Sequence, residues 1–215
     1  LHNNGFTGSG ITIGVFDAGF RNVDNMQGFN RLRSLGNIKY TYDFVDRTED
    51  LFSYTGNSHG TNVLSIIAGF IEGEYFGTAI DAEFYLFRTE DVSSENPIEE
   101  SYWVEAMERA DSLGIDVANT SLGYRVYNNS NYSYSQEEMD GNTAFITRGS
   151  NIAYEKGIVL VNSAGNSAAN GVIAPADSEG VFSIGAVDSF GNYASFSSQG
   201  SNFQQSIKPD ISARG

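Results

Sequence analysis

The sequence predicts an α/β protein, a three-layer domain in which helices flank a mainly parallel sheet. Short apolar, β-branched runs recur along the 215 residues, and longer stretches with helical spacing separate most of them. Strands that alternate with helices need crossover connections, and such connections produce a parallel sheet whose faces the helices cover. The chain shows no internal repeat, and its length suits one domain or at most two small ones.

The expected strands are short and rich in Val, Ile, Phe and Tyr. They cover residues 10–16, 37–45, 82–90, 115–123, 158–166 and 180–188. The first of them leads directly into Asp17, which places a carboxylate at the carboxyl end of a strand.

Three stretches predict helices, namely residues 59–71, 96–114 and 143–157. In the first, apolar residues such as Val63 and Ile67 recur at helical intervals. The second has Pro97 near its start, acidic residues in its first turn and Gly114 as its stop signal. The polar, aromatic residues 124–142 predict a surface insertion, whose tyrosines border a substrate cleft or pack on the flank of the domain.

Composition excludes several classes of function. The formal net charge of −15, from 12 basic and 27 acidic residues, repels nucleic acid. No run approaches the roughly 20 apolar residues of a membrane span. The chain has no cysteine, which excludes disulfides and thiolate metal sites. A hydrophobic content of 40% and an aromatic content of 13% argue against disorder.

Polar residues gather at the expected strand ends. Asp17, the segment Ser121-Leu122-Gly123 and Asn166 all lie at or just after such ends, and His59 begins a helix that the same edge can reach. Because ligands and chemistry collect at the carboxyl edge of an open α/β sheet, these residues are candidates for one functional site. Taken singly, each has a simpler interpretation as a cap, a turn residue or a surface residue.

One short motif points to a different enzyme class and can be excluded. The letters "GNSHG" match the nucleophile elbow of α/β-hydrolases, with Ser58 as the nucleophile. That fold places its acid and its histidine after the serine in chain order. No histidine follows His59, so the match is accidental.

Six segments extend over nearly the whole chain and read "TGSGITIGVFDAGF", "HGTNV", "NTSLG", "VNSAGN", "GAVDSFGNYASFSSQG" and "KPDISARG". They resemble segments of the subtilisin-like proteases in the order of that family, whose catalytic residues follow the order aspartate, histidine and distant serine. The resemblance implies a subtilisin-like α/β fold and a serine endopeptidase that cleaves peptide or protein substrates.

Residue roles follow from the same resemblance. It makes Asp17 the acid and His59 the general base of a catalytic triad, with Asn166 as the side-chain donor to the oxyanion. Ser121, Leu122 and Gly123 become the strand edge onto which the substrate adds, and Ser163, Ala164 and Gly165 a second wall of the specificity pocket.

The chain departs from the family pattern at several positions. Ala18-Gly19 follows the aspartate where the family usually has a hydroxyl residue and glycine, and Asn62 replaces a frequent second histidine. The segment 69–79, where many members insert a calcium loop, is short. The acidity of the chain is compatible with a structural calcium ion, for which the sequence assigns no ligands. Ile173 is expected to narrow the specificity pocket and favour small or medium side chains.

The nucleophile is the most important departure. In the family it lies in a Gly-Thr-Ser motif just after the segment that "KPDISARG" resembles, and the sequence given ends at Gly215. We therefore expect residues 1–215 to be a partial peptidase domain, processed or cut from a longer protein and inactive alone. The serine is expected in a missing C-terminal segment or a second chain, which would also cover apolar faces of the sheet and of helix 59–71.

Two alternatives remain open from the sequence. A non-catalytic, protease-like scaffold would hold peptides at the strand edge without cleaving them. An unrelated doubly wound domain would make all six matches coincidental. The presence of Asp17, His59 and Asn166 together weighs against the scaffold. The resemblance also favours a secreted or cell-envelope location of bacterial type.

Overall fold

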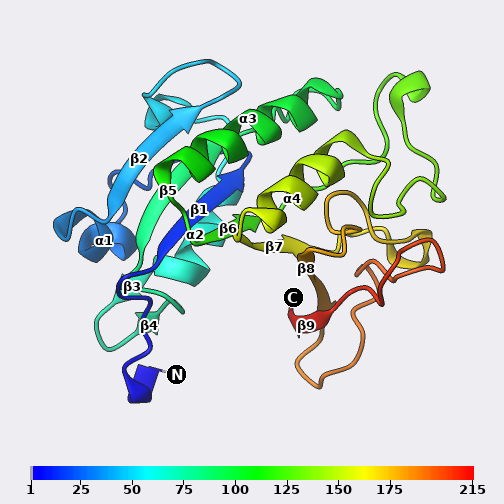
Figure 1. Ribbon diagram of the computed structural model, residues 1–215. Helices are drawn as coiled ribbons and strands as arrows, with labels where there is room; N and C mark the ends of the chain where they lie inside the picture. Colours follow the sequence, from blue (N-terminus) through cyan, green and yellow to red (C-terminus); the bar gives the residue numbers. More distant parts are fainter. Residues whose placement is uncertain (1) are drawn as a thin grey trace.

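The computed structural model describes residues 2–215, and a single parallel sheet organises them (Figure 1). Its seven strands stand in the order β2–β5–β1–β6–β7–β8–β9, and each neighbouring pair is parallel. The predicted α/β class with a mainly parallel sheet is confirmed. The strands are β1 (Thr12–Asp17), β2 (Ile38–Asp43), β5 (Glu83–Arg88), β6 (Val117–Thr120), β7 (Val159–Ser163), β8 (Val181–Val187) and β9 (Ile211–Arg214).

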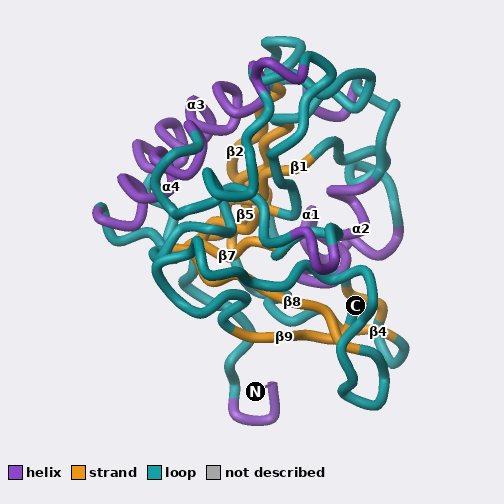
Figure 2. The backbone as a smooth tube through the Cα atoms, turned by 90° about the vertical axis from the view of Figure 1, so that its right-hand side faces the viewer, coloured by secondary structure: helices purple, strands orange, loops and turns teal. Residues whose placement is uncertain are grey.

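Helices cover both faces of this sheet, which gives three layers. The helices α3 (Ile98–Leu113) and α4 (Phe145–Glu155) lie side by side on one face. The other face carries α1 (Asn30–Ser34) and α2 (His59–Ala68), as the view in Figure 2 shows from the side. Residues 2–215 also contain five short 3-10 helices. One precedes β1, at His2–Asn4, and four lie in the connections, at Gln27–Phe29, Leu51–Ser53, Ser130–Tyr132 and Ala168–Asn170.

The alternation of side chains along β1 explains why both faces are covered. Successive residues of a strand point to opposite faces, so neighbours in sequence enter different cores. Phe16 packs with Trp103 of α3 in one core, whereas Val15 joins Leu64 of α2 in the other. All four side chains are at most 1% exposed, so neither face could be left to water without a large hydrophobic cost.

The helix ends follow local signals, with one correction to the sequence prediction. Gly114 ends α3 in the left-handed conformation, φ 78°, as predicted. The helix predicted over 59–71 instead ends at Ala68, because Gly69 turns to an extended conformation. The next residues form β3 (Phe70–Ile71), which pairs with β4 (Tyr75–Phe76) in a small antiparallel hairpin.

The segment 124–142 is attached to α3 through one buried carboxylate. Glu100 accepts hydrogen bonds from the hydroxyls of Tyr127, at 2.6 Å, and Tyr134, at 3.0 Å. It also accepts one from the backbone N–H of Ile146 in α4, at 2.8 Å. Within the segment Tyr127 is buried, whereas Tyr132 is exposed. Glu100 thus joins α3, α4 and the predicted insertion.

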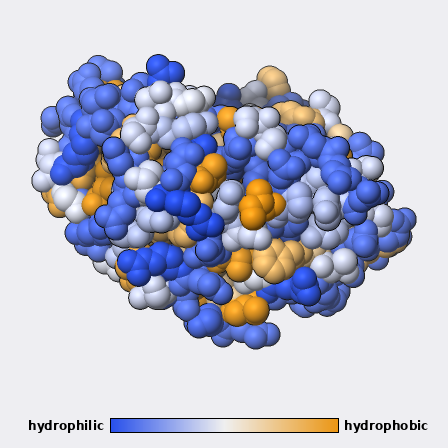
Figure 3. All heavy atoms as spheres, turned by 90° about the horizontal axis from the view of Figure 1, so that it is seen from above, coloured by the Kyte–Doolittle hydropathy of each residue, from blue (hydrophilic) through white to orange (hydrophobic). Residues whose placement is uncertain are grey.

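The surface is mainly hydrophilic on the face seen from above, where hydrophobic side chains form small separate groups (Figure 3). This distribution agrees with a chain that carries a net charge of −15. Within residues 2–215, no helix combines the length and the apolar character that are needed to cross a membrane.

We expect Glu100→Ala to lower the free energy of unfolding by about 2–4 kcal/mol, because two buried donors and one partly buried donor lose their acceptor. Urea denaturation of the wild type and the variant measures the change. Glu108→Ala is the matched control, since this glutamate is exposed on the same helix. Equal losses in the two variants would contradict the role assigned to Glu100.

Candidate active site

The register of the sheet brings three strand ends together. Asp17 of β1 pairs with Arg88 of β5, and Phe16 pairs with Thr120 of β6. The chain runs from β1 to strands on one side of it and then returns to β6 on its other side. In open α/β sheets a crevice forms at such a reversal of strand order, outside the carboxyl ends of the strands. Asp17 and Ser121, which directly follows β6, lie at this point.

A hydrogen bond between Asp17 and His59 occupies this edge. Nδ1 of His59 lies 2.7 Å from Oδ1 of Asp17, which also accepts the backbone N–H of Ala18 at 2.7 Å. Asp17 is fully buried, whereas the His59 side chain is half exposed. An ionised carboxylate only accepts hydrogen bonds, so the proton sits on Nδ1 of His59. The other ring nitrogen, Nε2, is then a base.

Close contact between the loop that follows β1 and the first turn of α2 aligns this pair. A Cβ on Gly60 would lie 2.7 Å from the carbonyl oxygen of Gly19 and 2.8 Å from Cβ of Asp17, so only glycine fits at the first turn of α2. Asn57 forms an Asx turn just before that helix, because its side-chain oxygen accepts the backbone N–H of His59 at 2.7 Å. His59 is therefore held against Asp17 by its backbone as well as by its ring.

The charges of Asp17 and His59 influence each other's pKa. Burial raises the pKa of Asp17, and the hydrogen bonds from His59 and Ala18 oppose that rise. The hydrogen bond to Asp17 raises the pKa of His59 above its usual 6.5, against the effect of its own burial. A carboxylate that stabilises the imidazolium strengthens His59 as a proton acceptor, which suits a general base.

A cavity of about 370 Å³ opens in front of His59. Nearly all the residues predicted for substrate binding line it, together with Asn57, Glu90 and Ile173. The predicted residues in its wall are Ser121, Leu122, Gly123, Ser163, Gly165 and Asn166. Ala164 is the exception, since it is buried and lines the neighbouring cavity. Asp17 does not line this cavity, and it contacts the site through its hydrogen bond to His59.

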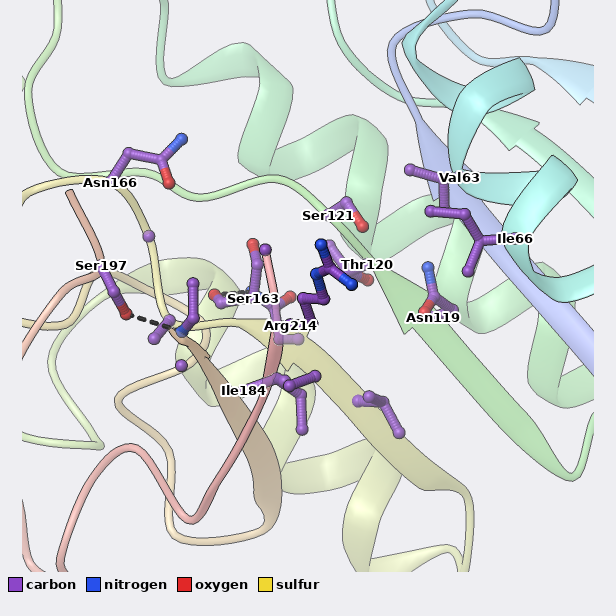
Figure 4. Close-up of a pocket in the computed structure, with 18 of the residues that line it drawn as sticks. Val63, Ile66, Asn119, Thr120, Ser121, Ser163, Asn166, Ile184, Ser197 and Arg214 are labelled. Atoms are coloured by element: carbon purple, nitrogen blue, oxygen red, sulfur yellow. Dashed lines mark hydrogen bonds between the residues drawn. The ribbon is translucent and has the colours of Figure 1, made fainter. Parts of the chain in front are cut away.

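A second cavity, of about 450 Å³, lies beside the first and shares Ser121, Ser163, Gly165 and Asn166 with it. In Figure 4, Val63 and Ile66 of α2 form one side of it, and the Arg214 side chain extends from β9 toward Thr120 and Ser121. Further apolar lining comes from residues such as Ile67, Val161, Ile184 and Phe196.

No serine hydroxyl is hydrogen-bonded to the His59 ring among residues 2–215. Two late serines have structural roles. Ser197 accepts the backbone N–H of Ala186 at 2.9 Å, and Ser198 accepts that of Ser167 at 3.0 Å. Over the same residues, no group of three or more His, Cys, Asp or Glu side chains is placed to hold a metal ion.

Comparison with known proteins decides the family. The family model described as "Subtilase family" matches residues 8–215 of this chain. The chain belongs to the subtilase family. The resemblance seen in the sequence is confirmed by this match.

Individual subtilases match over most of this chain. It is 30% identical over 203 residues to Subtilisin Savinase of Lederbergia lenta, covering 93% of this chain and 64% of that protein. It is 30% identical over 223 residues to Minor extracellular protease Vpr of Bacillus subtilis (strain 168), covering 95% of this chain and 25% of Vpr. The chain thus spans less than two thirds of either relative.

A solved structure shows the same fold. The crystal structure of MycP1 with the N-terminal propeptide removed superposes with a TM-score of 0.72 at 20% identity, covering all of this chain and 67% of that one. The three-layer, subtilisin-like architecture is therefore shown for this subtilase.

Sequence reasoning missed two residues of the site. Asn57 stands two positions before His59, a spacing typical of an Asx turn, and this signal could have been used. Glu90 ends the segment predicted as the third strand, but its position beside His59 depends on how β5 pairs with β1.

We expect Asp17→Asn to lower the pKa of His59, because the imidazolium loses the charge that stabilises it. An NMR titration of the ring signals measures the change, with His59→Gln to assign the signal. Asp50→Asn, which removes an exposed carboxylate elsewhere, should leave the titration in place. A His59 pKa that is equal in Asp17→Asn and wild type would show that the pair is not coupled.

Proposed function

We propose that this subtilase chain is the front part of a serine endopeptidase domain, which hydrolyses peptide bonds through an acyl-enzyme. The observation that carries the proposal is the 2.7 Å hydrogen bond between buried Asp17 and half-exposed His59, at the mouth of a cavity. A buried acid that orients a histidine, with the second ring nitrogen left as a base, is the arrangement that activates a serine.

The proposed chemistry proceeds in two halves. Nε2 of His59 removes the proton as the serine oxygen attacks the carbonyl carbon of the substrate, and Asp17 stabilises the imidazolium that results. The imidazolium then gives this proton to the leaving amine, and the C–N bond breaks to leave an ester on the serine. Water attacks the ester in the second half, with His59 again as base, and releases the acid and the free serine.

The other predicted residues take roles around this reaction. Asn166 is proposed to donate its side-chain N–H to the oxyanion, and its position in the wall of the cavity supports this role. Ser121, Leu122 and Gly123 are proposed to pair with the substrate backbone, and Ser163, Ala164 and Gly165 to form the opposite wall.

The nucleophile is proposed to come from a segment or chain outside these residues, so that residues 1–215 alone do not turn over substrate. The larger cavity supports this proposal, since it adjoins the His59 cavity and has apolar walls. Two of its residues also hold buried polar atoms without a hydrogen-bond partner among residues 2–215, namely Nδ2 of Asn119 and Oδ1 of Asn162. Backbone groups of an entering segment would satisfy both atoms.

A non-catalytic scaffold that binds peptides is the second candidate. It is favoured by the lack of a serine hydroxyl bonded to His59 within residues 2–215. In either case the ligand is a peptide or a protein. A secreted or cell-envelope location is proposed on the similarity to Vpr, which is named as an extracellular protease.

The test is intact-mass spectrometry of the protein that contains this chain, before and after a fluorophosphonate probe. We expect one probe adduct, and its formation should be lost in His59→Ala because the serine no longer has a base. The adduct should lie outside residues 1–215. An unlabelled protein that still binds peptides would establish the scaffold instead.

The specificity pocket is proposed to favour small or medium side chains because Ile173 narrows it. A Cβ on Gly165 would lie 2.8 Å from Cγ1 of Ile173, and the Ile173 side chain also lies against Gly123. The isoleucine therefore occupies the space between the two walls, where a large substrate side chain would have to enter.

We expect Ile173→Ala to raise kcat/KM for a peptide with Phe before the scissile bond relative to one with Ala, by about tenfold or more. The cause is the volume that the variant opens in the pocket. Ile152→Ala, an exposed position on α4, is the control and should leave the ratio unchanged. A wild-type preference for Phe would refute the narrow pocket.

A further inference from the structure

A carboxylate that the proposed reaction does not use stands at the cleft. The backbone N–H of Thr89 donates to the carbonyl oxygen of Asp17 at 3.1 Å, so the chain that leaves β5 continues beside the end of β1. The next residue, Glu90, lines the 370 Å³ cavity together with His59. Glu90 and Ser121 therefore border the cavity from the strands on either side of β1.

A hydrogen bond holds the Glu90 side chain in place. The hydroxyl of Tyr124 donates to Oε2 of Glu90 at 3.3 Å. Tyr124 itself is buried, and its backbone N–H donates to the carbonyl oxygen of Ala174 at 2.8 Å. The carboxylate is thus fixed by a packed residue, and it is not a mobile surface charge.

Among the residues that line this cavity, only His59 could give Glu90 a cationic partner. The other groups near Glu90 are the hydroxyl of Tyr124 and three acidic side chains, which belong to Glu95 of the following loop, Glu99 of α3 and Asp17 of β1. Arg88, two residues earlier, is already paired with Asp43 and Asp46, at 2.7 Å each. Burial and the charge of Glu95 raise the pKa of Glu90 to about 7.

The direction of the substrate side chains follows from the proposed function, on which this inference rests. A peptide that pairs with Ser121–Gly123 is extended, so its successive side chains point to opposite sides. If the residue whose carbonyl is attacked points into the pocket at Ile173, the preceding residue points the other way. Ile173 lies between the segments that follow β6 and β7, whereas Glu90 follows β5, which is on the other side of β6 in the sheet. Glu90 lines the cavity together with the half-exposed apolar side chain of Val92.

We propose that Glu90 selects substrates with lysine or arginine at the residue immediately before the one whose carbonyl is attacked. The carboxylate pairs with the cationic end of that side chain, and Val92 packs against its methylene groups. Glu90 is thus a specificity residue, which binds a positively charged substrate side chain next to the scissile bond without taking part in the chemistry.

The test measures kcat/KM for peptides that differ only at this residue, with lysine, glutamine or glutamate, in the protein that contains this chain and its nucleophile. Lysine should exceed glutamine about tenfold, the size expected for a partly buried charge pair, and glutamate should be the poorest. In Glu90→Gln, which retains the acceptor for Tyr124, the three values should come together. Glu95→Gln removes a nearby exposed carboxylate that does not line the cavity, and it should retain the preference.

The pH dependence separates a charge effect from a structural one. The lysine-to-glutamine ratio cancels the common titration of His59, and it should grow between pH 6 and pH 8 as Glu90 ionises. If Glu90→Gln only impaired folding, kcat/KM would fall equally for all peptides. The lysine-to-glutamine ratio of the variant would then equal that of the wild type.

The outcomes distinguish this inference from the proposed function. Cleavage of all three peptides at equal rates would overturn the role of Glu90 and leave the peptidase intact. Absence of both cleavage and probe labelling would overturn the peptidase, and fluorescence anisotropy of the same peptides then decides the inference. Tighter binding of the lysine peptide to wild type but not to Glu90→Gln would support it, and equal binding would overturn it.

Discussion

The hydrogen bond between Asp17 and His59 is the interaction on which the rest of the site depends. It joins the end of a central strand to the start of a helix, two elements 42 residues apart in the chain. A fully buried carboxylate is costly unless it is hydrogen-bonded, and here the histidine ring and the N–H of Ala18 both bond Oδ1, whereas Oδ2 has no partner among residues 2–215. The close approach of Gly60 to Gly19 makes this geometry available. The backbone after β1 and at the first turn of α2 is thus shaped around one pair of side chains.

The cleft that this pair borders differs between its two sides. Ile173 fills the space between Gly123 and Gly165 on one side, so that side admits little volume. Glu90 on the opposite side adds a fixed negative charge, supported by Tyr124, to a protein that is already strongly acidic. Under the proposed function, the two residues would favour a ligand with a small or medium side chain at one position and a basic one at the position before it. Such a ligand would also be attracted at long range, because the net charge of the chain is −15.

The two cavities share a wall, so the contents of one can affect the residues that line the other. Ser121, Ser163, Gly165 and Asn166 face both the proposed substrate cavity and the larger apolar cavity next to it. Whatever occupies the larger cavity therefore contacts the residues that are proposed to hold the substrate and the oxyanion. Occupation of one cavity would help to fix the walls of the other, because packed side chains move little independently.

Apart from α1, β9 and the β3–β4 hairpin, the sequence by itself determined the succession of strands and helices along the chain, the aspartate at the end of β1, the histidine at the start of α2 and the family. These features are local, since apolar periodicity, glycine stop signals and short motifs depend only on residues that are close together in the sequence. It placed the end of α2 three residues too late, because apolar spacing continues past Ala68 and only the pairing of Phe70 with Phe76 shows a hairpin there.

The resemblance had already assigned Ile173 to the specificity pocket, and the structure adds that its side chain lies between Gly123 and Gly165. Only the tertiary structure decided that Glu90 lies beside His59. This contact joins residues from separate elements, and it is set by strand register and by the packing of loops, so no local pattern in the sequence encodes it.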